Sequence, residues 1–152
     1  MPKDEPGLDA WRAMLLASNA ALRAIEADLS RAGGIPLTWY DVLLELNGEG
    51  GRLRMQEVAE RVVLSRTRVS RLVDEMARAG LVRKEPDEDD GRVVWAVITE
   101  EGGRELRATA PRYLRGIEDH FAVHLTDDEK KVLAEALGRV AKVHHDTGRS
   151  RR

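Results

Sequence analysis

Apolar residues recur at steps of three and four along residues 8–32, which is the spacing of one face of an α-helix. This stripe consists of Leu8, Trp11, Leu15, Leu22, Ile25 and Leu29. Glycines and a proline in residues 33–36 end the pattern. We expect a second helix to begin at Thr38 as its N-cap, with Asp41 in the first turn, and to stop in the glycine-rich residues 47–51.

Two shorter amphipathic segments follow, in the pattern of a helix-turn-helix. The first helix is predicted over about residues 54–62. The second is predicted over residues 66–79, with Ser65 as its N-cap and Gly80 as its C-cap. Its apolar positions have the spacing i, i+3, i+4, i+7, which leaves the opposite face polar and basic; they are Val69, Leu72, Val73 and Met76.

After this motif the pattern changes to that of β-strands. Residues 81–84 have a strand-like pattern, and residues 92–99 are rich in β-branched and aromatic side chains. Residues 85–91 between them contain a proline, a glycine and five acidic side chains, a turn-forming stretch. The sequence therefore predicts a β-hairpin, or wing, directly after the second helix of the motif.

Two further helices are predicted in the C-terminal third. Thr99 is expected to cap the first, which runs to about residue 122 with a kink or break at Pro111. Residues 126–129 have the pattern of a capping box, so the last helix is expected to begin there and to run to about residue 145.

Together these elements predict a mainly α fold with a small β-hairpin wing, in which a winged helix-turn-helix domain occupies residues 36–99. Such a domain alone needs only about 70 residues by ordinary domain size. The helices in residues 8–32 and 100–145 flank it and carry apolar stripes that a small core cannot cover. We therefore expect them to be dimerisation helices of a two-fold homodimer.

Charge is distributed unevenly along the chain. The 152 residues carry a formal net charge of −2, yet residues 52–84 contain nine basic and four acidic side chains, a local charge of +5. A basic segment in an otherwise acidic chain is typical of a phosphate-binding face, and therefore of a nucleic-acid partner. Its place on the predicted helix-turn-helix strengthens that interpretation.

Several classes of protein are disfavoured by composition. The chain has no cysteine, so disulfides and thiolate metal sites are excluded. No apolar run approaches the roughly 20 residues that span a bilayer, and the polar N-terminus is unlike a signal peptide. We expect a cytoplasmic protein without a membrane partner. Glycine-rich nucleotide motifs and a Gly-x-Ser-x-Gly motif are missing, so we expect no cofactor and no enzyme activity.

Residues 65–102 resemble the MarR family of bacterial transcription regulators. The shared motif is a recognition helix ending in glycine and followed by Leu-Val-x-Arg, then Asp-x-Arg at the wing tip and Leu-Thr-x-x-Gly after it. This chain has Gly80-Leu81-Val82-Arg83, Asp90-Gly91-Arg92 and Ile98-Thr99-Glu100-Glu101-Gly102 in those places. Two departures are Ile98 in place of leucine and Gly91 where a basic residue is common, and the second is expected to weaken the phosphate contact of the wing.

The polar face of the second short helix supplies the expected DNA-binding residues. Arginine grips guanine edges in the major groove, and serine or threonine bonds to bases or phosphates. These residues are Ser65, Arg66, Thr67, Arg68, Ser70 and Arg71. The resemblance further implies that Arg92 enters the minor groove and that Asp90 orients it. The acidic residues 87–89 would oppose phosphate, so some are expected to turn away or to pair with Arg83 or Lys84.

The resemblance also implies a ligand-responsive repressor that binds a pseudo-palindromic operator on double-stranded DNA. Its effector would be a small aromatic or phenolic molecule in a cleft between the dimerisation helices and the winged domain. The side chains available for such a cleft are Trp11, Met14, Trp39 and Tyr40. Aromatic residues at helical spacing are more often part of a core, so each also has that structural interpretation.

Two alternatives remain open. The winged helix could be a protein-interaction module without specific DNA binding, which salt-dependent binding to duplex DNA would exclude. His120 and His124 are four residues apart on the predicted helix, a spacing suited to a metal-responsive regulator. Most metal sites need three or four ligands, so the leading expectation is that no metal binds.

Overall fold

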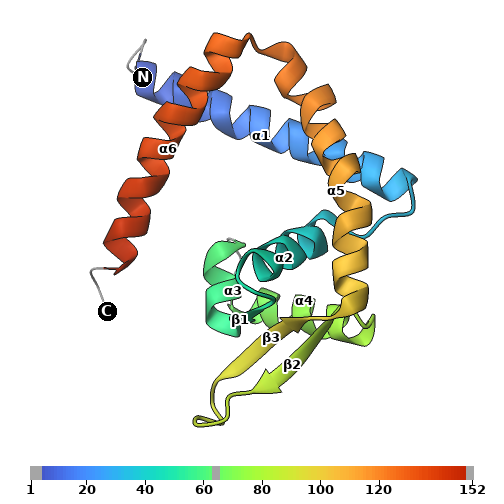
Figure 1. The fold of residues 1–152 in the computed structure, drawn as a ribbon. Coiled ribbons are helices and arrows are strands. Elements are labelled where there is room, and N and C mark those ends of the chain that lie inside the picture. The colour runs from blue at the N-terminus through green and yellow to red at the C-terminus, as the bar shows by residue number, and fades with distance from the viewer. Residues whose placement is uncertain (1–4, 63–65, 150–152) are drawn as a thin grey trace. The chain divides into compact units, whose positions relative to one another are not determined.

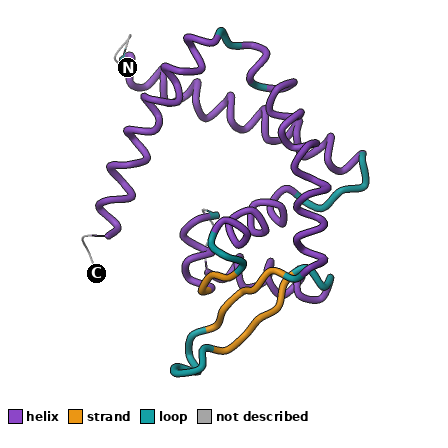
Figure 2. The backbone as a smooth tube through the Cα atoms, in the orientation of Figure 1, coloured by secondary structure: helices purple, strands orange, loops and turns teal. Residues whose placement is uncertain are grey.

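The computed structural model describes residues 5–62 and 66–149, and within them it shows a mainly helical fold with a small antiparallel sheet (Figures 1 and 2). The fold class predicted from the sequence is confirmed. The elements are α1 (Pro6–Arg31), α2 (Leu37–Gly48), β1 (Arg52–Arg54), α3 (Met55–Arg61), α4 (Arg66–Arg78), β2 (Val82–Pro86), β3 (Val94–Ile98), α5 (Glu100–His120), the 3₁₀ turn η1 (Ala122–His124) and α6 (Asp127–Arg149).

The chain divides into two compact units. One comprises Arg23–Leu114, with the end of α1, helices α2 to α4, the sheet and the first part of α5. The other comprises Met1–Leu22 and Arg115–Arg152, with the start of α1, the end of α5, η1 and α6. Among the described residues, no helix is both long enough and apolar enough to cross a membrane.

The core of the unit Arg23–Leu114 forms where α2, α3, α4 and the sheet meet. The apolar stripe of α4 faces this core, with Val69, Val73 and Met76 fully buried and Leu72 half-buried. They are joined by Val42, Leu43 and Leu46 of α2, by Val58 of α3 and by Ala96 of β3. Burial of this stripe fixes which face of α4 points outward, because a helix with one apolar face has only one stable orientation on a core.

The sheet has three antiparallel strands in the order β1–β3–β2. The sequence predicted the β2–β3 hairpin, which Figure 1 shows projecting beyond helices α2 to α4. It missed β1, which pairs Arg52 with Val97 and Arg54 with Trp95. That strand has three residues and only Leu53 between its two arginines is buried, so it lacks the run of β-forming residues that reveals a strand in a sequence.

The predicted N-cap Thr38 is wrong. Helix α2 begins one residue earlier, at Leu37, and its cap residue is Pro36, which makes no side-chain cap bond. The carbonyl of Pro36 accepts the amide hydrogens of Trp39 and Tyr40 at 3.0 and 3.1 Å. Proline fits this position because it has no amide hydrogen and its fixed φ leads into the helix.

The other predicted caps are confirmed where the structure describes them. Gly80, at φ 79°, ends α4 with bonds from its own amide to Ala77 and from the amide of Leu81 to Met76. The Thr99 hydroxyl accepts the Gly102 amide hydrogen at 3.0 Å and donates to the Gly80 carbonyl at 2.7 Å. This threonine therefore joins the start of α5 to the end of α4. The predicted cap Ser65 lies outside the described residues.

The C-terminal helices differ in part from the prediction. The capping box is present, with bonds of 2.8 and 3.2 Å between Thr126 and Glu129. Helix α5 continues through Pro111, so no break occurs there. It ends at His120, and His124 lies in η1. The two histidines are therefore not on one α-helix, and the i, i+4 metal spacing expected for them is wrong.

The unit that contains the chain ends has almost no interior of its own. Gly116 is the only buried residue among residues 5–22 and 115–144. Large apolar side chains on its helices are instead exposed: Leu8, Trp11, Leu15, Leu16, Leu22, Phe121, Val123, Val132, Leu137, Val140 and Val143. These helices therefore leave much of their apolar surface uncovered.

Gly102 allows α5 to approach the chain closely at Leu81. A Cβ atom at Gly102 would lie 2.1 Å from the Leu81 carbonyl oxygen, a backbone atom that cannot turn aside. We expect Gly102→Ala to lower the free energy of unfolding by about 2 kcal/mol, although alanine favours helices. Chemical denaturation at matched protein concentration measures this change.

The neighbouring Gly103 provides a matched control. A Cβ there would meet only the end of the Arg107 side chain at 3.3 Å, which is free to shift. Gly103→Ala should therefore be neutral or stabilising by up to about 1 kcal/mol. Equal effects of the two substitutions would show that the contact with Leu81 does not limit residue 102.

Asp41 carries the clearest carboxyl pKa change in the described chain. Burial, and then the nearby Glu45 carboxylate, raises the pKa of Asp41 from 3.8 to about 6. The folded state therefore holds the proton more tightly than the unfolded state, and stability from this group is lost as pH rises through about 6. We expect Asp41→Asn to raise the free energy of unfolding at pH 7.5 by about 1 kcal/mol, after allowance for solvent screening.

Denaturant unfolding of both proteins between pH 4 and pH 8 tests this expectation. The difference between the curves isolates Asp41, because the other titrating groups are shared. The stabilisation should shrink towards pH 4, where the carboxyl group is protonated in the folded state and partly protonated in the unfolded state. Parallel pH profiles would contradict the raised pKa.

Candidate nucleic-acid interface

The outer face of α4 presents most of the predicted DNA-binding residues. Thr67, Arg68 and Arg71 are exposed, and Ser70 is half-buried. Arg66 is the first residue of α4, whereas Ser65 lies outside the described residues. Because the opposite stripe of α4 is locked in the core, these exposed side chains lie on one outward face.

An ion pair links α4 to the wing. Lys84 Nζ on β2 lies 2.8 Å from Asp74 Oδ1 on α4. The hydrogen bond from Lys84 holds the pKa of Asp74 below its usual value. Asp74, on the second half of α4 near Arg78, is thus partly neutralised, which limits its repulsion of a polyanion.

The acidic residues of the wing do not pair as predicted. Arg83 pairs with Glu85 at 3.1 Å, and Lys84 pairs with Asp74, so neither bonds to residues 87–89. Asp87 instead accepts the Trp95 indole hydrogen at 2.7 Å. Of the two expected outcomes, pairing with Arg83 or Lys84 is therefore wrong, because the indole of Trp95 and the carboxylates of Asp74 and Glu85 are the partners that these groups find instead.

Arg92 and Asp90 lie together at the wing tip. Asp90 Oδ1 accepts the Arg92 amide hydrogen at 3.1 Å and lies 3.8 Å from Arg92 Nε. The Arg92 side chain is 96% exposed, so its guanidinium reaches solvent. The Asp90 carboxylate is therefore placed to orient the Arg92 side chain.

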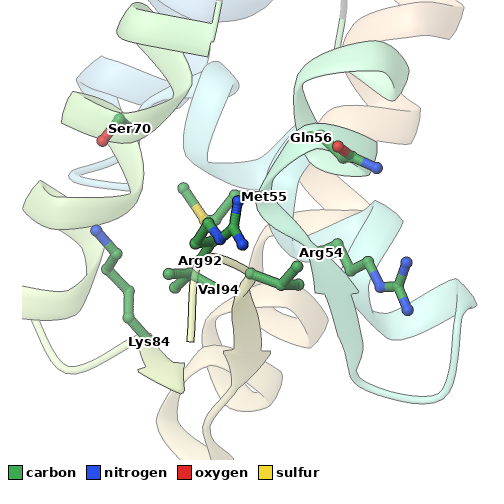
Figure 3. Close-up of a pocket in the computed structure, with 8 residues that line it drawn as sticks. Arg54, Met55, Gln56, Ser70, Lys84, Arg92 and Val94 are labelled. Carbon is green, nitrogen blue, oxygen red and sulfur yellow. The ribbon is translucent and has the colours of Figure 1, made fainter. Parts of the chain in front are cut away.

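A basic pocket lies between the wing, α3 and α4 (Figure 3). Its volume is about 330 Å³, and its described lining is Arg54, Met55, Gln56, Ser70, Lys84, Arg92, Val93 and Val94. Three of these residues are basic and none is acidic. Lys84 extends from β2 towards α4, and Arg92 lies near Met55 in the middle of the view. The pocket can therefore accept an anionic group.

Arg54, Gln56 and Lys84 were not among the predicted site residues. Arg54 and Lys84 belong to the basic segment, but their convergence depends on the pairing of β1 with β3, which the sequence did not reveal. Charge counting alone gave no reason to separate them from Arg83, which the structure ties to Glu85.

Two arginines of β1 stack on Trp95. The guanidinium carbons of Arg52 and Arg54 lie 4.1 and 5.2 Å from the ring centroid. Contacts at this distance are cation–π interactions, which hold the positive groups at the surface without neutralising them. The sheet therefore keeps positive charge next to α4 and the wing.

The four residues predicted to line an effector cleft are divided between the two units. Trp11, 56% exposed, and Met14, half-buried, belong to the unit that contains the chain ends. Trp39 is half-buried and Tyr40 is buried in the other unit. Tyr40 stacks on Tyr113 with ring centroids 4.8 Å apart, which gives it a packing role in its own unit.

The described part of the chain shows no cluster of metal-binding side chains. No cluster of three or more histidine, cysteine, aspartate or glutamate side chains there has the geometry to hold a metal ion. The arrangement of α4, the wing and the basic pocket is instead suited to a polyanionic surface.

Comparison with known proteins gives a consistent result. The model of the MarR family matches residues 33–93. Sco3205, a MarR family transcriptional regulator from Streptomyces coelicolor whose structure is known in complex with DNA, is 30% identical, with a TM-score of 0.81 over 93% of this chain and 91% of that one. AbsC, another regulator of this family from the same organism, is 29% identical, with a TM-score of 0.83 over 96% and 99% of the two chains.

A curated relative supports the same assignment. YwaE of Bacillus subtilis, an uncharacterised helix-turn-helix-type transcriptional regulator, is 26% identical over 123 residues, which are 81% of this chain and 71% of that protein. Together with the winged fold and the outward basic face of α4, these likenesses show that the chain belongs to the MarR family and is a DNA-binding transcription regulator.

Proposed function

We propose that this regulator binds a pseudo-palindromic operator as a homodimer and represses transcription until a small aromatic or phenolic ligand releases it. The observation that carries the proposal is the combination of an exposed polar face on α4 with a basic pocket beside it. A recognition helix alone fits many surfaces, but a helix next to cations spaced along the wing fits a groove bordered by phosphates.

The outer face of α4 reads bases in the major groove. Arg71 is exposed in the first half of the helix, where side chains of a recognition helix reach base edges. Thr67 and Ser70 lie on the same side and suit bonds to bases or phosphates. The remaining members of this proposed set are Ser65, Arg66 and Arg68.

The wing and β1 supply contacts to the DNA backbone. Lys84 and Arg54 line the basic pocket, so a phosphate next to the major groove would lie within their reach. Arg92, held beside Asp90 and exposed at the wing tip, enters the minor groove. These cations position the protein, whereas α4 supplies the sequence preference.

The helices outside the DNA-binding domain form the dimer. We place that domain at residues 36–99 and the dimerisation helices at residues 8–32 and 100–145. Support comes from the unit that contains the chain ends, where Gly116 alone is buried among the residues described through 144. A second copy covers these faces by two-fold symmetry and presents two recognition helices roughly 34 Å apart, one turn of DNA.

Ligand response is supported by two more distant members of the fold. The Bordetella bronchiseptica protein BpsR, 14% identical, has its DNA binding regulated by 6-hydroxynicotinic acid. The organohalide sensor RdhR-CbdbA1625, 21% identical, has been solved with 2,4-dichlorophenol. By analogy, a similar ligand is proposed for the four candidate residues Trp11, Met14, Trp39 and Tyr40, and its binding would favour a conformation with lower operator affinity.

Selection of random duplex DNA by the purified protein, at two salt concentrations, tests the proposed activity. A pseudo-palindromic motif is expected, and the genes next to its genomic copies then indicate the ligand class. Weak, sequence-blind binding that salt abolishes would contradict specific recognition and would favour the protein-interaction alternative.

Arg71→Ala is expected to weaken binding to the selected duplex by about 1–3 kcal/mol, because a base contact is lost. Fluorescence anisotropy with duplexes altered at single positions measures both affinity and preference. Arg104→Ala is the control, since Arg104 is an exposed arginine of α5 that pairs with Glu100 and Glu101. Unchanged affinity for Arg71→Ala would remove Arg71 from the recognition set.

The proposed dimer predicts a solution mass of about twice the chain mass of 17.0 kDa. Leu16→Glu places a charge on the exposed face of α1, where Leu16 is 66% exposed, and should shift the protein towards monomers. Leu44→Glu, at a 44% exposed leucine of α2, is the matched control and should leave the mass unchanged. Sedimentation velocity measures the mass of the native protein and of both variants. A monomeric native protein would contradict the dimer.

A further inference from the structure

The turn at the wing tip joins β2 to β3 and contains Arg92. The Asp87 amide donates to the Val93 carbonyl at 2.9 Å, and the Val93 amide donates to the Asp90 carbonyl at 3.0 Å. These bonds close the turn at its base and middle. A loop of this length is free to adopt many conformations unless further bonds select one of them.

The Asp87 carboxylate accepts further hydrogen bonds that select one conformation of this turn. Its Oδ1 accepts the Trp95 indole hydrogen at 2.7 Å, and its Oδ2 accepts the amide hydrogens of Asp89 and Asp90, each at 3.2 Å. The indole bond, and then the two amide bonds, lower the pKa of Asp87. The group is therefore a carboxylate at neutral pH, and its hydrogen bonds are charge-assisted.

The chain of contacts continues from Asp87 to the guanidinium at the tip. Asp87 holds the Asp90 amide, and the Asp90 carboxylate holds the Arg92 amide at 3.1 Å and lies 3.8 Å from Arg92 Nε. The Arg92 side chain is itself 96% exposed and packs on little else. Its direction therefore depends on the backbone of the turn.

Trp95 is a firm anchor for this chain of contacts. It lies in the central strand β3, paired with Arg54 on one side and Glu85 on the other. Its ring is half-buried and is covered by the guanidinium groups of Arg52 and Arg54. The indole N–H therefore has a direction that is fixed by the sheet and does not depend on the conformation of the turn.

We propose that Trp95 is a positioning residue for DNA binding, whose indole N–H holds Asp87 and thereby fixes the turn that presents Arg92 to DNA. The inference rests on the proposed function, because it requires that Arg92 contacts DNA. The ring of Trp95 packs in the sheet, and its N–H alone acts on the wing tip. The two roles are separable, since phenylalanine keeps a ring and removes the donor.

Trp95→Phe, Arg92→Ala and the double variant, titrated with the selected duplex by fluorescence anisotropy, form the test. We expect Trp95→Phe to reduce affinity roughly 3- to 10-fold, the range for one lost hydrogen bond. The double variant should bind no more weakly than Arg92→Ala alone, because the indole acts only through Arg92. Glu85→Gln, which alters an acid of β2 paired with Arg83, is the control and should leave affinity unchanged.

Asp87→Ala gives the second approach, because it removes the indole bond from the exposed end, together with the two amide bonds that the indole bond is proposed to support. It should reproduce the loss and the non-additivity with Arg92→Ala. Amide ¹⁵N relaxation should show faster motion at Asp89 and Asp90 in both variants, a change that loss of ring packing alone would not produce. The measurements on Asp87→Ala decide the outcome if Trp95→Phe disturbs the fold.

The possible failures are distinguishable. Unchanged affinity for Arg92→Ala would overturn its proposed contact with DNA, and with it the positioning role. Reduced affinity for Arg92→Ala but unchanged affinity for Trp95→Phe and Asp87→Ala would overturn the positioning role alone. Losses that add in the double variant would show that Trp95 affects DNA binding by a route other than Arg92.

Discussion

Burial of one face of α4 is the constraint on which the rest of the interface depends. Val69, Val73 and Met76 are inserted between α2, α3 and the sheet, which leaves no freedom in the rotation of the helix about its axis. The outward direction of Arg71 follows directly from that burial. A helix whose apolar stripe were weaker by one residue would present the same sequence of polar side chains without a defined direction.

Local patterns were sufficient to predict α4, the hairpin and the caps at Gly80, Thr99 and Thr126, because each depends on residues within one turn or one strand. Pairings between distant segments were not predictable in the same way. Strand β1 is a strand only because β3 lies beside it, and the partner of Lys84 is ten residues away on another element. The basic pocket depends on both of these pairings, so no pattern along the sequence predicts it.

The local net charge of residues 52–84 indicated where the interface lies but not which of their basic side chains belong to it. Of the nine basic residues in residues 52–84, Arg61 bonds to Glu45 on α2 and to Glu49 just after it, and Arg83 bonds to Glu85. Arg52 and Arg54 instead rest on an aromatic ring, which preserves their charge. The attraction of a phosphate depends on where the positive charges lie and not on the net charge of the segment, because salt screens each charge beyond about 8 Å at physiological ionic strength.

The missing side chain at Gly102 has a geometric consequence. Helix α5 has 21 residues and therefore rises by roughly 30 Å from its first turn to its last. Gly102 lies in that first turn, against the carbonyl of Leu81. A larger residue at Gly102 would tilt this first turn away from Leu81, and the displacement would grow along α5 as far as Leu114, the end of the unit to which both residues belong.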